Sequence, residues 1–154
     1  MKKTLVVYYS RTGTTKILAN LLAKKLNANI DEITDLSKRL GMIGWLTSGK
    51  DATQKKLTRI EYKKDPSKYD LVIIGGPVWS GTVSPAIRAY LTKEKENMSK
   101  VAFFSTAGSL KSVGALKTME ELTKKPVFKI NFDTQELRGK VSKKVNEFIT
   151  KLNV

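Results

Sequence analysis

The sequence contains no cysteine and no histidine. It therefore has no thiol nucleophile, no disulfide, no Cys or His zinc or haem ligand, and no Ser-His or Cys-His catalytic pair. Any chemistry must come from hydroxyls, carboxylates, lysine, backbone dipoles or a bound cofactor. We assign no catalytic side chain and no metal site from the sequence.

Long apolar runs are also missing. No stretch approaches the roughly 20 apolar residues that a membrane-spanning helix requires. Lys2 and Lys3 precede an apolar run over 5–9, but this run is too short for the core of a signal peptide. We therefore expect a cytoplasmic protein without a membrane span.

Acidic residues are scarce. The chain has 29 Lys and Arg against 14 Asp and Glu, which leaves a formal net charge of +15. The electrostatic field of a protein with this positive net charge attracts anionic partners. The cations are mostly lysines in scattered pairs, such as Lys24-Lys25 and Lys143-Lys144, without the clustered arginines and interleaved aromatics of a nucleic-acid site. This favours a lysine-rich solvated surface and an anionic partner over nucleic acid.

The length and composition are those of a globular protein. The chain has 154 residues, of which 40% are hydrophobic and 28% charged. No linker rich in proline or glycine divides it, so we expect one domain over 1–154. A domain of this size buries roughly 70% of its unfolded surface and needs no disulfide or metal to fold.

Short apolar runs alternate with helical patterns along the chain. This alternation predicts a parallel sheet covered on both faces, a doubly wound α/β/α fold of three layers. A segment over 36–56 exceeds a minimal crossover and is a helix plus loop, a lid or a partner surface. The patterns predict strands over 5–9, 28–33, 71–74, 101–104 and 126–132, and helices over 17–26, 84–91, 113–122 and 137–152, the last after a capping box over 133–136.

Three loops are candidates for the functional site. In an open parallel sheet, ligands bind beyond the carboxyl ends of the strands, where the strand order reverses. Small and hydroxyl residues concentrate in the loops after the first, third and fourth predicted strands. These loops span 10–15 (Ser-Arg-Thr-Gly-Thr-Thr), 75–82 (Gly-Gly-Pro-Val-Trp-Ser-Gly-Thr) and 105–109 (Ser-Thr-Ala-Gly-Ser).

Each loop offers one part of a ligand site. The first places four hydroxyls and a glycine at the start of a helix, which suits a phosphate, whereas an ordinary helix cap needs only one hydroxyl. In the second, Trp79 either covers the edge of the core or stacks on a flat ring. In the third, Ala107 and Gly108 allow the backbone to approach a ring closely. A phosphate at one end and a ring at the other indicate a mononucleotide, with flavin mononucleotide (FMN) the natural candidate.

The same residues resemble the flavodoxin family. The stretch 6–15, continued by Ala19 and Leu22, is similar to the flavodoxin signature, and 76–79 with Pro85 is similar to the second flavin loop. The loop over 105–109 resembles the third. The resemblance implies a five-stranded sheet in the order 2-1-3-4-5 and FMN bound without a covalent link.

The resemblance also implies roles for individual residues. Residues of the first loop would contact the phosphate, and Arg11 in that loop would face either solvent or the phosphate. The second loop lines the isoalloxazine with Trp79 as the stacking residue, and the third meets the pyrimidine edge. The residues so assigned are Ser10, Arg11, Thr12, Gly13, Thr14 and Thr15, then Pro77, Val78, Trp79, Ser80 and Gly81, then Thr106, Ala107, Gly108 and Ser109.

Two classes of function follow. The first is a redox flavoprotein, either a flavodoxin-like electron carrier or oxidoreductase serving an anionic redox protein or small-molecule acceptor, or a flavin-dependent reductase of quinone type. The second is a non-enzymatic basic module that binds nucleic acid or an acidic protein. A yellow purified protein supports the first class, whereas a steep salt dependence of nucleic-acid binding supports the second.

Overall fold

The structure is a computed structural model that describes residues 2–37, 58–108, 113–135, 137 and 141–153. Of the segment expected over 36–56, all but Leu36 and Ser37 lies outside the described residues.

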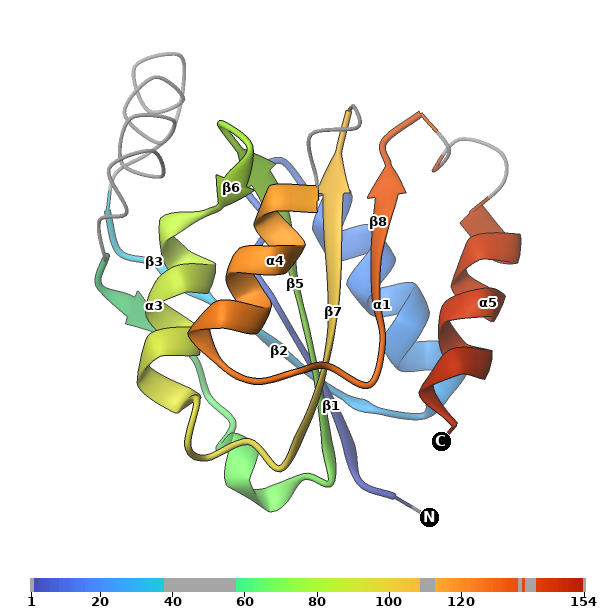
Figure 1. The fold of residues 1–154 in the computed structure, drawn as a ribbon, viewed down its shortest axis with the longest axis horizontal. Helices are drawn as coiled ribbons and strands as arrows, with labels where there is room; N and C mark the ends of the chain where they lie inside the picture. Colours follow the sequence, from blue (N-terminus) through green and yellow to red (C-terminus); the bar gives the residue numbers. More distant parts are fainter. Residues whose placement is uncertain (1, 38–57, 109–112, 136, 138–140, 154) are drawn as a thin grey trace.

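A central parallel sheet organises the chain. Its strands run side by side in the order β2-β1-β5-β7-β8 (Figure 1). This is the predicted order 2-1-3-4-5, and it confirms the doubly wound α/β class. The bounds are β1 Thr4–Tyr8, β2 Asn29–Glu32, β5 Leu71–Trp79, β7 Lys100–Ala107 and β8 Lys129–Asp133.

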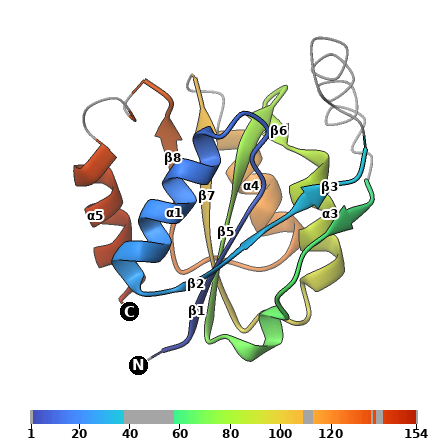
Figure 2. The ribbon, with the colours of Figure 1, turned by 180° about the vertical axis from the view of Figure 1, so that it is seen from behind.

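Helices cover both faces of the sheet. Helices α3 (Pro85–Glu94) and α4 (Val113–Leu122) lie on one face, in front in Figure 1. Helices α1 (Thr14–Leu26) and α5 (Val141–Leu152) lie on the other, which Figure 2 brings forward. Both described ends of the chain lie at the lower edge of the sheet in Figure 1. There Lys2 Nζ donates to the Asn153 carbonyl over 3.1 Å.

Each sheet face has its own apolar core. All five residues of β1 are buried, as expected for a strand covered on both sides. Leu5 and Val7 belong to the core under α3 and α4, whereas Val6 and Tyr8 belong to the core under α1 and α5. This alternation follows from the two-residue period of a strand.

Helix α3 starts as the sequence predicts. Ser84 is its N-cap, with Oγ accepting the Ile87 N–H at 3.5 Å, and Pro85 occupies the first helical position. The predicted capping box over 133–136 includes Glu136, which lies outside the described residues. The Asp133 carboxylate accepts the Gln135 N–H over 2.8 Å in a turn after β8, and α5 begins only at Val141.

The sequence did not reveal four short elements. Strands β3 (Thr34–Asp35) and β4 (Ile60–Glu61) form a separate antiparallel pair, and η1 (Pro66–Lys68) is a single 3-10 turn. Strand β6 (Thr82–Val83) folds back on the end of β5. In the parts of the chain that the structure describes, no helix is both long and apolar enough to cross a membrane.

Candidate functional site

The carboxyl ends of β1, β5 and β7 meet at one edge of the sheet (Figure 1). The strands are in parallel register, with Tyr8 opposite Gly75 and Gly75 opposite Phe104. The Tyr9 N–H donates to the Gly75 carbonyl over 3.1 Å and extends this register past the end of β1. All three predicted loops therefore begin at the same edge.

The first loop leaves the start of α1 open. Gly13 is the N-cap, with a φ of 101° that side-chain-bearing residues rarely adopt, and no side chain caps the first turn. A Cβ at Gly13 would meet nothing within 4 Å. The Gly13 N–H donates to Ser10 Oγ over 3.1 Å, which closes the loop. Backbone donors of the first turn of α1 are thus available to an anion.

Four hydroxyl groups belong to this loop. Ser10 and Thr14 are half-buried, Thr12 is exposed, and Thr15 is buried. Thr15 Oγ1 lies 2.8 Å from Thr106 Oγ1 of β7, in a buried contact that joins the first and third loops. In such a pair one hydroxyl donates to the other, so the accepting hydroxyl keeps its own proton for a further acceptor. Arg11 is half-buried.

A cavity of about 470 Å³ adjoins the same helix start. It is bordered by Thr14 and Ile17 of α1 and by Thr134, Gln135 and Leu137 after β8. Ile17 is 71% exposed, so an apolar side chain borders the hydroxyl-rich entry to α1. Thr14, which we assign to ligand binding, therefore borders open space that a ligand could occupy.

The second predicted loop is a hairpin. Strand β5 continues through Pro77 and Val78 to Trp79, and β6 returns with Thr82 opposite Trp79. Ser80 and Gly81 form the two-residue turn and have positive φ values of 50° and 76°, as hairpin turns of this length require. The turn packs closely on α4. A Cβ added at Gly114 of that helix would lie only 2.7 Å from the Gly81 carbonyl oxygen.

Trp79 is held at the edge of the core. Its ring meets Tyr9 edge to face, with centroids 5.7 Å apart and planes at 85°. Tyr9 is buried, whereas Trp79 is half-buried and packs against the core under α3 and α4. The side chain therefore covers the core edge and still presents surface to a ligand.

The third loop begins at the end of β7. Thr106 is buried, Ala107 half-buried and Gly108 exposed. The Ala107 carbonyl accepts the Thr134 N–H over 3.1 Å, and a Cβ at Gly108 would have only ordinary contact, 3.5 Å from Thr134 Oγ1. Ser109 lies outside the described residues.

Arg88 was missed by the sequence reasoning. It lies on α3 and is only 6% exposed, and its Nη2 donates to Thr82 Oγ1 of the hairpin over 3.4 Å. Nε has no hydrogen-bond partner, and burial lowers the pKa of the guanidinium. A signal was present, because Arg88 follows Ile87 and precedes Leu91 by three residues, on the apolar side of the predicted helix.

The acidic residue Glu32 lies beside the start of α1. Glu32 pairs with Lys16 of α1 over 3.0 Å, and both side chains are exposed. Burial and a hydrogen bond to Glu32 raise the pKa of the Tyr8 hydroxyl above its ordinary value, so that hydroxyl stays protonated. Among the residues that the structure describes, no cluster of three or more acidic side chains could hold a metal ion.

A flavodoxin family model matches residues 3–152, and the chain belongs to the flavodoxin family. A solved flavoprotein from Lactobacillus acidophilus NCFM, in complex with FMN, is 27% identical with a TM-score of 0.76, and the match covers 90% of this chain and 97% of that one.

More distant structures share the fold. A flavoprotein structure from Bacteroides uniformis is 22% identical over 97% of this chain and 98% of that one, with a TM-score of 0.79. Oxidised flavodoxin 1 from Bacillus cereus is 15% identical over 98% and 97%, with a TM-score of 0.55. Among curated proteins, none matches this chain.

Proposed function

We propose that this protein binds FMN without a covalent link and works as a redox flavoprotein. The observation that carries the proposal is the uncapped start of α1, with Gly13 at positive φ among hydroxyl side chains. Membership of the flavodoxin family supports the choice of ligand, as does the relative from L. acidophilus that was crystallised with FMN.

The donor set of the first loop fits a phosphate. Backbone N–H groups at a helix start and neutral hydroxyls bind an anion without a fixed counter-cation. In the proposal Ser10, Thr12, Gly13, Thr14 and Thr15 hold the phosphate, and Arg11 faces either solvent or the phosphate. Hydroxyl donors keep their protons across the physiological pH range, so any pH dependence of phosphate binding should follow the phosphate itself, whose second pKa is about 6.

The hairpin and the third loop fit a flat ring. Trp79 offers an aromatic face, and Tyr9 fixes its orientation by the edge-to-face contact. In the proposal the residues from Pro77 to Gly81 line the isoalloxazine, and those from Thr106 to Ser109 meet its pyrimidine edge. Bound FMN supplies the electron-carrying chemistry, whereas the protein orients the ring and excludes water from it.

The proposed ligand is FMN rather than FAD. The hydroxyl-rich loop serves one phosphate, and the chain has no GxGxxG turn for a pyrophosphate after β1. Reconstitution of the flavin-free protein with each ligand tests this choice. We expect a yellow complex with FMN that survives gel filtration and much weaker retention of FAD. A colourless protein after incubation with FMN would refute the flavin function itself.

The finer role that we propose is electron exchange with an anionic partner, either an acidic redox protein or a small-molecule acceptor. The formal charge of +15 supports this choice, because a basic surface speeds encounters with anions and salt screens that effect. Stopped-flow oxidation of the reduced protein by an acidic redox protein should slow steeply as salt rises. A reductase of quinone type would instead turn over a neutral quinone at a rate that salt changes little.

A further inference from the structure

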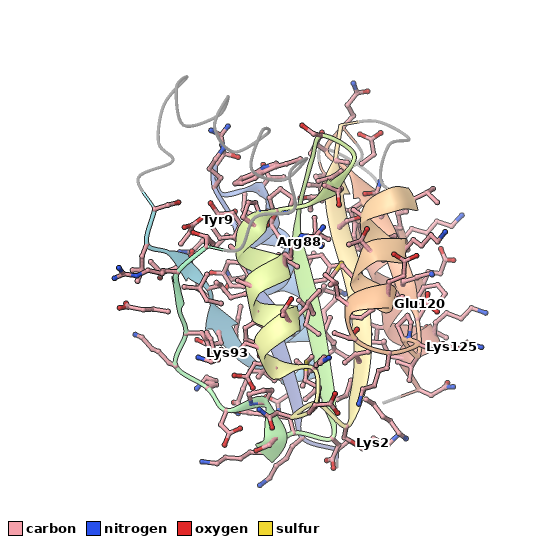
Figure 3. All side chains as sticks on the ribbon, turned by 60° about the vertical axis from the view of Figure 1, so that its left-hand side comes forward. Lys2, Tyr9, Arg88, Lys93, Glu120 and Lys125 are labelled. Carbon is pink, nitrogen blue, oxygen red and sulfur yellow. The ribbon has the colours of Figure 1, made fainter. Side chains whose placement is uncertain are left out.

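Arg88 is a buried cation without a counter-charge. The residue is 6% exposed, and burial lowers the pKa of its guanidinium. Within the described residues no carboxylate pairs with its guanidinium, whose one side-chain hydrogen bond, from Nη2 to Thr82 Oγ1, is long at 3.4 Å and whose Nε has no partner. Figure 3 shows Arg88 on the upper half of α3, whereas Lys93 lies toward the opposite end of the same helix.

Such an arrangement destabilises the flavin-free fold. Taking a charge out of water carries a large desolvation penalty, and an arginine cannot escape it by losing its proton. Where no partner offsets the penalty, an apolar residue of similar shape is neutral or stabilising. A buried cation whose desolvation is offset by one long hydrogen bond alone points to a negative charge that develops in the working protein.

The hydrogen bond to Thr82 directs Arg88 toward the proposed ring site. Thr82 lies opposite Trp79 in the two-stranded pairing of β5 and β6. Side chains directly opposite in such a pair project from the same face of the hairpin. Arg88 therefore reaches the face that carries Trp79, from the protein interior, where a charge is screened much less than at the surface.

We propose that Arg88 is the internal counter-charge for reduced FMN, an inference that rests on the proposed flavin function. When a reductant delivers two electrons and the solvent one proton, the ring gains one net negative charge. A fixed cation behind Trp79 stabilises that charge and favours reduction. Arg88 thus acts on the equilibrium between oxidised and reduced ligand without touching the ligand.

The surface lysines cannot substitute for it. Lys93, for example, is exposed and lies 5.0 Å from the centroid of the Tyr62 ring. Water and salt screen such a charge strongly over a Debye length of about 8 Å at physiological ionic strength. Lys93→Met and Arg88→Met remove the same formal charge from one helix, so the pair separates a local from a bulk effect.

The experiment compares wild type with R88M, R88Q, R88K and K93M. Each protein is loaded with FMN and titrated with dithionite against a reference dye, at about 0.1 M and about 0.5 M salt. We expect R88M and R88Q to lower the equilibrium constant for reduction about tenfold, which is about 30 mV for a two-electron couple. R88K should keep most of the effect, K93M should resemble wild type, and the R88M shift should persist at high salt.

Two further readouts separate this role from a structural one. In urea, flavin-free R88M should be at least as stable as wild type, because the variant removes an unpaired buried charge. Affinity for oxidised FMN should change little, since that ring carries no net charge. If Arg88 served only packing, R88M would destabilise the fold. A stable fold together with a lower reduction potential of bound FMN therefore supports the proposed role.

Several outcomes overturn the proposal. An unchanged potential in FMN-loaded R88M or R88Q refutes the inference about Arg88 and leaves the flavin function intact. Failure of both neutral variants to fold makes Arg88 a structural residue and also refutes it. If wild type itself binds no FMN, the proposed function fails, and the inference about Arg88 fails with it.

Discussion

Thr15 and Thr106, 91 positions apart in the sequence, bring their hydroxyl oxygens within 2.8 Å of each other. Both side chains are buried, with exposed fractions of 2% and 4%. The contact ties the first turn of α1 to the end of β7, so the first and third loops are held in one arrangement before any ligand binds. Because these two loops are already ordered, less conformational entropy is lost when a ligand binds to them.

A double-mutant cycle on this pair should be strongly non-additive. Thr15→Val or Thr106→Val alone leaves a buried hydroxyl without its partner, which costs about 1–3 kcal/mol of unfolding free energy. Removing both hydroxyls leaves neither one unsatisfied, so the double variant should cost less than the sum. Urea unfolding of the four flavin-free proteins gives the coupling. Strict additivity would show that each hydroxyl finds another partner.

Thr12→Val combined with Thr14→Val should weaken FMN binding at least about tenfold. Each lost hydrogen bond to a charged group is worth about 1.5–3 kcal/mol, and about 1.4 kcal/mol corresponds to tenfold in affinity. Fluorescence titration of FMN measures the change. Thr150→Val on α5 is the control, because its hydroxyl bonds within its own helix to the Asn146 carbonyl. Unchanged affinity for FMN in the double variant would show that this loop does not bind the phosphate.

Trp79→Ala should abolish most of the tryptophan quenching that accompanies flavin binding and should weaken that binding. The reason is direct stacking of the indole on the ring. The chain has two tryptophans, and Trp45, outside the described residues, provides the matched variant. Trp45→Ala should leave the flavin-dependent quenching in place. The reverse pattern would assign the ring contact to the segment around Trp45 instead of the hairpin.

Gly75→Ala should destabilise the fold by about 1–3 kcal/mol or more, through overpacking. A Cβ at this position would lie 1.9 Å from Phe104 Cζ, inside a ring that is itself fully buried. Gly108→Ala is the control, since its Cβ would meet only Thr134 Oγ1 at 3.5 Å. Thermal unfolding of the flavin-free proteins should lower the midpoint for the first variant and leave the second near wild type. Equal midpoints would mean that Phe104 moves aside at little cost.

Much of the scaffold was predictable because local patterns and the sheet agree. The apolar runs of β1, β5 and β7 become strands buried on both faces, and Ser84-Pro85 starts α3 as expected. The strand order came from the resemblance to flavodoxins, since apolar spacing alone does not say which strands are neighbours. The site residues assigned from the sequence remain predictions about ligand contacts, although the described ones do gather at one edge of the sheet.

The errors have physical causes. The strand predicted over 71–74 runs on to Trp79 as β5, because the turn at Ser80-Gly81 lets β6 pair with it. The helix predicted from 137 is described as α5 over Val141–Leu152, and the Asp133 carboxylate accepts the Gln135 N–H in a turn before it. The burial of Arg88 depends on how α3 packs beside the hairpin, which no local pattern encodes.

Lys2 and Asn153 meet at the lower edge of the sheet, opposite the loops that gather at its upper edge (Figure 1). Residues this close in space can be bridged by a short linker, so the chain is a good subject for circular permutation. New ends could be opened far from the ligand edge while the original ones are joined. The same geometry lets either end be attached to an electrode or a bead with the upper edge facing solution, where a partner can reach it.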